Sequence, residues 1–242
     1  MEHLILRLDA PLQSWGTVAM DPRRPTSPCP TLSALTGMIA SALGWRYRDA
    51  EKTNALQDCV RYAVREDVSP VLVRDFQTAD LGRIGSRGWT RWGVEERGGG
   101  AASTGTQILE KHYLAGGVFT VALTLEAERP VQLSEVADAL DRPARPLFLG
   151  RKGCMPASRI LQGTEDGRTP FEVLRRWPVD DDVDLPLRCW YNHGQGPDSG
   201  EPARVSDRRN FALDRFAGRR TLRLAHIEPP RRSPSSRGPH ES

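Results

Sequence analysis

One segment of the chain collects cations around glycines without any acidic residue. Residues 142–159 read RPARPLFLGRKGCMPASR, and Gly150 and Gly153 flank the pair Arg151 and Lys152. Glycine lets a backbone approach an anion closely and turn its N–H groups outward, while neighbouring cations supply charge. The segment therefore predicts a phosphate-binding loop, with a solvated basic turn as the alternative. Its cations are Arg142, Arg145, Arg151, Lys152 and Arg159.

Tryptophans and arginines are interleaved in a long stretch that has little periodicity. Residues 78–106 are too many for an ordinary connection, so we expect either a functional excursion or a disordered insert. Aromatic rings beside arginines suit a platform that stacks on bases or a wedge between them. The alternative is that the tryptophans anchor the insert to the body. The candidate stacking residues are Arg87, Trp89, Arg91 and Trp92.

Two charged tracts follow towards the C-terminus. Residues 204–223 contain seven arginines against Asp207 and Asp214, and arginine forks suit RNA phosphates and protein carboxylates equally. Residues 180–184 contain four aspartates, but no histidine or further carboxylate lies at ligand spacing. We interpret this acidic tract as a solvated turn or a partner surface, not as a metal site.

Composition and cysteine spacing exclude several classes of protein. A net charge of +3 does not by itself indicate nucleic acid, so the local distribution of charge has to decide. The four cysteines form no C-x-x-C pair, so we expect reduced thiols, no metal and no cofactor. No Walker loop supports nucleotide hydrolysis. No signal peptide and no apolar run of about eighteen residues is visible, which predicts a cytoplasmic protein without a membrane partner.

Hydrophobic patterns indicate the elements that position these segments. Alternation of leucines with Ile5 and Arg7 predicts a half-buried strand over residues 3–9. Thr31 is the expected cap of a helix that ends near Leu43, and Ser134 is the expected cap of a shorter helix. Further strands are predicted over residues 60–65, 71–76, 107–114, 118–125, 187–191 and 221–227, and a helix-like turn over 171–177.

The order of these elements is strand, helix, two strands, excursion, strand, helix and strand. This order fits an α+β, ferredoxin-like (RRM-like) βαββαβ core with an insertion. An RRM reads RNA with aromatic side chains on the open face of its sheet. The corresponding faces of the predicted strands carry no aromatic residue, so we expect loops to bind RNA. The residues on those faces are Ile5, Arg7, Thr120, Ala122 and Thr124.

A set of short motifs in fixed order is similar to the CasD family. The motifs are LILRLDAPLQSWG at 4–16, RPT at 24–26, PTLSALTGMIASALGW at 30–45, YAVR at 62–65, RDFQTA at 74–79, HYLAGGVFTVAL at 112–123 and RPLFLGRKGC at 145–154. The resemblance covers residues 3–160 well and is looser from there to Ile227. In that family the subunit holds the five-prime handle of the guide RNA (crRNA) in type I-E CRISPR Cascade complexes of antiviral defence.

The resemblance implies an RRM-like fold with a glycine-rich loop and a projecting thumb, which corresponds to residues 78–106. It implies guide RNA, the repeating backbone subunit (CasC-like) and the large PAM-reading subunit (CasA-like) as partners, with target DNA met only indirectly. The subunit would cap one end of the backbone filament. The RNA-binding residues that the motifs carry over are Gln13, Trp15, Arg24, Thr26, Arg145, Arg151 and Lys152.

The resemblance also leaves an enzymatic alternative open. A related subunit of type I-C systems cuts precursor RNA with a tyrosine, a lysine and a histidine, and this chain contains Tyr47, Lys111 and His112. Metal-independent cleavage needs a base at the ribose 2′-hydroxyl and a cation at the phosphate, which these residue types supply. Because the N-terminal motifs resemble type I-E, we expect a non-catalytic subunit.

The expected organisation has three parts. Residues 1–160 form the RNA-binding core, with the thumb inserted at 78–106. Residues 161–228 form a C-terminal β extension packed on that core. Residues 229–242 are rich in proline, serine and arginine, with almost nothing to bury, and are expected to be a flexible tail.

Overall fold

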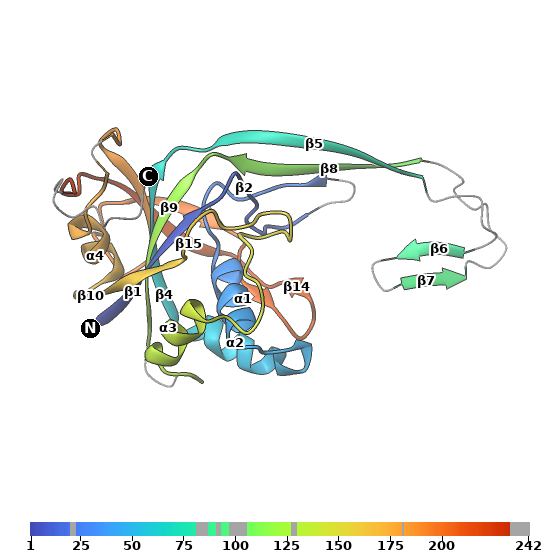
Figure 1. Ribbon diagram of the computed structural model, residues 1–242, viewed down its shortest axis with the longest axis horizontal. Helices are drawn as coiled ribbons and strands as arrows, with labels where there is room; N and C mark the ends of the chain where they lie inside the picture. The colour runs from blue at the N-terminus through green and yellow to red at the C-terminus, as the bar shows by residue number, and fades with distance from the viewer. Residues whose placement is uncertain are drawn as a thin grey trace.

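The computed structural model describes residues 1–19, 23–80, 87–90, 93–96, 106–126, 130–180 and 182–232. Within them the largest sheet is antiparallel, with seven strands in the order β10-β1-β9-β4-β11-β15-β12 (Figure 1). Helices lie on both faces of this sheet, and a long two-stranded arm leaves it at one end. The strand bounds are Glu2–Asp9 (β1), Val60–Val68 (β4), Val118–Leu125 (β9), Leu161–Asp166 (β10), Leu187–Asn192 (β11), Glu201–Val205 (β12) and Arg220–Ile227 (β15).

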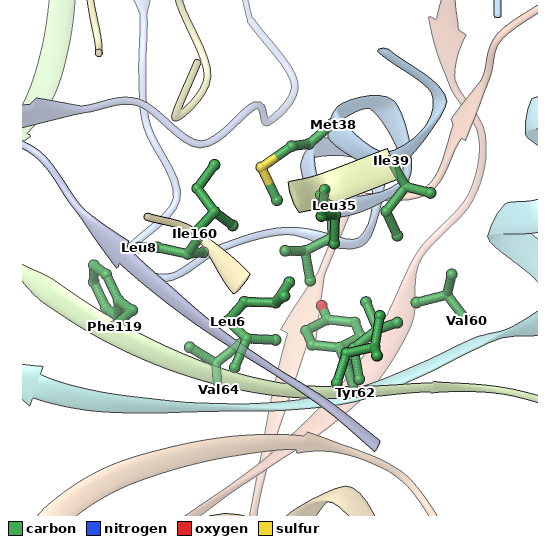
Figure 2. Packing of buried hydrophobic residues seen from close by; sticks show 14 of the residues in the cluster. Leu6, Leu8, Leu35, Met38, Ile39, Val60, Tyr62, Val64, Phe119 and Ile160 are labelled. Carbon is green, nitrogen blue, oxygen red and sulfur yellow. The ribbon is translucent and has the colours of Figure 1, made fainter. Parts of the chain in front are cut away.

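The main core lies between the sheet and a layer of helices. Helices α1 (Leu32–Ala42) and α3 (Leu133–Asp141) cover this face, and α2 (Ala50–Cys59) packs beside α1. Alternate residues of the strands point towards the helices because side chains alternate between the faces of a sheet. Figure 2 shows Leu6, Tyr62 and Val64 of the sheet beneath Leu35 and Ile39 of α1.

A second core closes the other face of the same sheet. Ile5, Ala63 and Ala122 are fully buried there, and they pack with Phe171 and Val173 of α4 (Pro170–Arg176). The prediction that the first strand is buried on one face only was therefore wrong. The face that carries Ile5, which was expected to be open, is covered by α4 and the segment after it. This face offers no open sheet for RNA.

A buried ion pair stands at the edge of this second core. Arg65 is buried, and its guanidinium donates to the Asp67 carboxylate at 2.5 Å and to the carbonyls of Leu174 and Trp177 at 2.9 and 2.6 Å. Thr120 donates to the same carboxylate. A charge taken out of water is tolerated only when it is paired and fully hydrogen-bonded. Arg65 thus ties β4 to the end of α4.

The N-terminus of α1 is capped from a distant part of the chain. The Leu32 N–H donates to the Asp207 carboxylate at 2.9 Å, and the Thr31 side chain makes no cap hydrogen bond. Thr31 does occupy the cap position, as predicted. The group that accepts the free N–H of Leu32 is the Asp207 carboxylate and not the Thr31 hydroxyl. At the C-terminus, Gly44 adopts a positive φ of 76°, the conformation that glycine supplies there.

The second predicted helix has its cap two residues before the expected one. Gln132 precedes α3, and its N–H donates to the Glu135 carboxylate at 2.7 Å. Ser134 lies inside the helix, so its assignment as the cap was wrong. Several elements were not predicted, among them α2 with its short 3-10 turn η1 (Tyr47–Asp49), strand β10 and the edge strand β12.

The arm consists of β5 (Val71–Asp80) and β8 (Thr106–Ala115), which pair antiparallel along their whole length. Both strands are longer than predicted and reach into the excursion expected at residues 78–106. Beyond them β6 (Arg87–Thr90) pairs with β7 (Gly93–Glu96), and the remainder of that stretch lies outside the described residues.

The C-terminal part of the chain belongs to the same sheet as the N-terminal part. Strand β10 follows the boundary expected at residue 160 and pairs with β1, while β11, β15 and β12 extend the sheet beyond β4. Residues 229–232 are docked on the body: Val179 donates to the Pro230 carbonyl at 2.9 Å, and Arg232 donates to the Val179 carbonyl at 2.7 Å. The flexible tail was therefore predicted too early; residues 233–242 lie outside the described residues.

Candidate nucleic-acid interface

The glycine-rich loop is fixed against the short strand β2 (Leu12–Gln13). Ser14 donates to the Leu149 carbonyl at 3.0 Å, and Leu149 donates to the Cys154 carbonyl at 2.8 Å. Gly150 has a φ of 104°, and a Cβ on it would lie 1.7 Å from the Ser14 carbonyl oxygen. Only glycine fits both the backbone conformation and this contact. The loop is thus a rigid turn that presents Arg151 and Lys152.

Arg151 fills a gap between two short strands that pair with the same side of β8. Strand β2 pairs at Leu114 and Ala115, and β3 (Arg23–Arg24) pairs at Glu110 and Lys111. The Arg151 guanidinium donates to the His112 carbonyl at 2.9 Å and to the Arg24 carbonyl at 3.0 Å. Its carbon also lies 4.7 Å from the centre of the Tyr113 ring. Arg151 therefore joins the glycine loop, β3 and the arm.

Cations gather where β3 lies beside the root of the arm. Arg23 and Arg74 have side chains that are 75% and 64% exposed, and both reach Glu110, at 3.5 and 3.9 Å. Lys111 is the pairing partner of Arg24 and donates to Gln77 at 2.7 Å. Lys152 is exposed next to Arg151. Six cations and two carboxylates lie around the arm root, and those on the strands are divided between its two faces because neighbouring residues of a strand alternate: Arg23, Arg24, Arg74, Lys111, Arg151 and Lys152 with Asp75 and Glu110.

Two of the residues expected to touch RNA are buried instead. Gln13 donates to the carbonyls of Leu8 and Gly117 at 3.2 and 2.6 Å, and Trp15 packs edge-on against Phe119. Neither side chain reaches the surface, so direct contact with RNA is corrected to a supporting role.

Thr26 also has a supporting role, because it holds the first loop in place. Its hydroxyl oxygen accepts the Trp15 N–H at 2.8 Å, and Ser27 donates to the Trp15 carbonyl at 2.9 Å. These contacts hold the two ends of the first loop together. They fix the chain directly after β3, and so they help to position Arg23 and Arg24.

The remaining cations of the glycine-rich segment point elsewhere. Arg145 donates to the Trp45 carbonyl and lies 3.4 Å from the Ser41 hydroxyl, where it binds the C-terminal end of α1. Arg159 pairs with Asp141 at 2.5 Å. The expectation of five cations gathered without a counter-charge was therefore wrong, because an acid that precedes the segment neutralises one of them and α1 engages another.

The three residues of the catalytic alternative do not form one site. Lys111 and His112 are neighbours on β8, so their side chains lie on opposite faces of the arm. Tyr47 lies in η1, and its hydroxyl donates to the Ala212 carbonyl at 3.2 Å. Of the thumb candidates, Arg87 and Trp89 fall on β6, while their side chains and all of Arg91 and Trp92 lie outside the described residues.

Comparison with known proteins decides the family. A family model described as CRISPR-associated protein (Cas_Cas5) matches residues 3–223. The chain belongs to the Cas5 family of CRISPR-associated proteins. The CRISPR system Cascade subunit CasD of Escherichia coli strain K12 is 32% identical over 190 residues, which cover 75% of this chain and 80% of the relative. The resemblance to CasD is thereby confirmed.

Two solved structures resemble this Cas5-family chain over nearly its whole length. A chain of a CRISPR RNA-guided surveillance complex has a TM-score of 0.69 and 28% identity, and covers 94% of this chain and 91% of its own. A crystal structure of a Cas protein has a TM-score of 0.62 and 26% identity, with 93% and 94% covered. No described helix of this Cas5-family chain is long and apolar enough to cross a membrane.

Proposed function

We propose that this chain is a Cascade subunit that holds guide RNA at the root of its arm. The cluster of cations on β3, β5, β8 and the glycine loop carries the proposal; Arg23, Arg74 and Lys152 are exposed, and Arg151 joins the glycine loop to β3 and β8. Phosphate oxygens are the ligands that suit several arginines and a lysine spread over an open surface. A relative that is named as a Cascade subunit supports this assignment.

The part of the guide RNA that we assign to this surface is its five-prime handle. In this proposal the chain caps one end of the backbone filament and meets the repeating backbone subunit and the large PAM-reading subunit. Target DNA reaches the chain only through them. The support is the similarity to CasD and to a chain of an RNA-guided surveillance complex.

We further infer that the core is of the ferredoxin-like, RRM-like class. The four strands joined through α1 and α3 lie in the order β10-β1-β9-β4, and each neighbouring pair is antiparallel. In chain order these are the fourth, first, third and second strands of a βαββαβ unit. The arm is then an insertion between the second and third strands.

The proposed role is non-catalytic. A general base and a cation must act on the same ribose and phosphate to cleave RNA. Here Lys111 and His112 point to opposite faces of β8, and the Tyr47 hydroxyl is bonded to the Ala212 carbonyl instead of to either of them. This geometry supports binding over cleavage.

The test replaces Arg23 and Lys152 with glutamine in one chain. Both side chains are exposed, and their loss removes two phosphate contacts while the backbone pairing of β3 stays intact. We expect guide-RNA affinity to fall roughly tenfold at physiological salt, and the slope of log K against log salt to fall by about 0.7 per lost contact. Fluorescence anisotropy over a salt series measures both quantities.

The matched control replaces Arg168 and Arg175, near α4 on the other face of the sheet. Both side chains are exposed and form no ion pair within the described residues, so the change in charge is the same. An equal loss of affinity in this control would mean that the affinity for RNA depends only on the net charge of the chain. The assignment of the site to the arm root would then be withdrawn.

A further inference from the structure

The arginine-rich stretch at residues 204–223 divides into two classes. Four of its arginines pair with acids of the chain: Arg208 with Asp58, Arg209 with Asp214, Arg220 with Asp207 and Arg223 with Asp198. The other three are Arg204, Arg215 and Arg219; they are exposed and form no ion pair in the described part of the chain. The paired arginines therefore serve the fold, and the unpaired ones are available to a ligand.

Two of the unpaired arginines belong to a small hairpin that lies over the helical layer. The hairpin joins β13 (Arg209–Asn210) to β14 (Arg215–Phe216), and Gln57 of α2 bonds both the N–H and the carbonyl of Arg209. Phe216 points inward: a Cβ on Gly16 would lie 3.6 Å from its ring. Because neighbouring residues of a strand alternate, Arg215 faces outward. Arg219 follows on the same exposed connection.

The tip of this hairpin meets an aromatic residue that is unusually exposed. Tyr47 is 71% exposed, and its hydroxyl donates to the Ala212 carbonyl in the hairpin turn. Arg46 and Arg48 flank it and are also exposed, and their guanidinium groups form no ion pair within the described residues. Two acids lie beside them: Asp49, whose carboxylate accepts the Arg46 N–H at 2.8 Å, and the exposed Glu51.

We propose that Arg46, Arg48, Arg215 and Arg219, with the ring of Tyr47, form a second surface that binds a nucleic-acid backbone. We call it the hairpin surface. It begins at Gly16, in the same loop that leads to β3, and runs along the hairpin to Tyr47. Arginine forks suit phosphate oxygens, and an exposed ring between two arginines suits stacking on a base.

An acidic protein is the competing ligand for such a surface. The hairpin surface carries four exposed arginines and one exposed ring, whereas protein interfaces typically have a desolvated apolar centre. Leu213, at the hairpin turn, is an exposed aliphatic side chain. The excess of arginine over apolar side chains favours a polyanion. The guide strand and a duplex share this chemistry, and the test separates them.

The experiment replaces Arg46, Arg48, Arg215 and Arg219 with glutamine in the full chain. Labelled guide RNA and labelled duplex DNA of unrelated sequence are titrated separately by anisotropy over a salt series, with the chain alone and in its assembled complex. We expect at least a tenfold loss of affinity for one of the two probes, and a salt slope lower by about 0.7 to 0.9 for each lost contact. Loss with RNA alone assigns the surface to the guide, and loss with duplex alone assigns it to the target.

The control is again the pair Arg168→Gln and Arg175→Gln. Affinities for both probes that match this control would overturn the proposal. So would loss of complex assembly with both affinities unchanged, since that result marks a protein contact. The variant with Arg23 and Lys152 replaced is measured in the same experiment and tests RNA binding at the arm root. A wrong assignment of the hairpin surface is therefore distinguished from a wrong assignment of the arm root.

Tyr47 is tested separately because it touches the hairpin. Tyr47→Phe removes the hydrogen bond to Ala212 but keeps the ring, and Tyr47→Ala removes both. Stacking predicts that Tyr47→Phe binds like the unmodified chain while Tyr47→Ala binds several-fold more weakly. Equal loss in the two variants would show that the residue acts only as an anchor of the hairpin, and would remove the ring from the proposal.

Discussion

Arg151→Ala is expected to weaken guide-RNA binding roughly 100-fold, more than the loss of any other single cation at the arm root. The substitution removes one phosphate ligand and also the two charge-assisted hydrogen bonds that join β3 to β8. Each such bond contributes about 1.5–3 kcal/mol, and about 1.4 kcal/mol corresponds to a tenfold change in affinity. Without them β3 is free to move, and Arg23 and Arg24 lose their fixed positions. Anisotropy measures the affinity, and hydrogen exchange of the β3 amides measures the release of the strand.

Arg151→Lys separates the charge of this residue from its geometry. Lysine keeps the charge, but its single ammonium cannot reproduce a planar fork between the His112 and Arg24 carbonyls. We therefore expect most of the loss to remain in this variant. Lys152→Ala has no effect on β3 and should weaken binding by less than tenfold. Normal affinity and normal exchange in Arg151→Lys would mean that Arg151 acts only through its charge.

Asp207→Ala is expected to lower the free energy of unfolding by about 3 kcal/mol, because it leaves the partly buried Arg220, 18% exposed, without its acid. The Asp207 carboxylate accepts two bonds from Arg220, both at 2.6 Å, and also the first free N–H of α1, from Leu32. Burial by itself would lower the pKa of Arg220, but the Tyr62 oxygen and the Asp207 carboxylate raise it above its ordinary value. Urea denaturation followed by circular dichroism measures the loss.

Two further variants keep this prediction testable if Asp207→Ala does not fold. Asp207→Asn retains an acceptor for the Leu32 N–H and should be less harmful. The double change Asp207→Ala with Arg220→Met removes both charges and should recover part of the stability. A loss below about 1 kcal/mol for Asp207→Ala, or no recovery in the double variant, would contradict the role of this pair.

Strong periodicity predicted the elements that build the main core. The main core buries the leucines of β1, the apolar stripe of α1 and the alternate apolar residues of β9. Because each element buries apolar residues at a regular spacing, the residue types alone predict it. β10 reads LQGTED and is a polar edge strand, which alternation does not distinguish from a loop. α2 was missed for a related reason, since it buries polar groups such as Gln57 against the Arg209 backbone.

Some residues of the candidate site could be predicted from local sequence, and others could not. The glycines and the Arg151–Lys152 pair are local signals, and the structure places them in a turn beside the arm; binding of phosphate there stays a prediction. Arg23 and Arg74 were missed because their position depends on pairing between distant strands, although Arg74 stands in a motif shared with the family. Gln13 and Trp15 were placed in the site because they belong to a motif, while the structure buries them beneath it. A motif thus marks a region and does not separate its ligands from its supports.

Ultraviolet crosslinking of the guide RNA in the assembled complex, with mass spectrometry of the linked peptides, tests the proposed site most directly. We predict crosslinks between the five-prime nucleotides and peptides that contain residues 23–24, 74–76, 110–113 and 150–152, and none with α4. Crosslinks to α4 alone, or a complex that retains no RNA on this chain, would contradict the account.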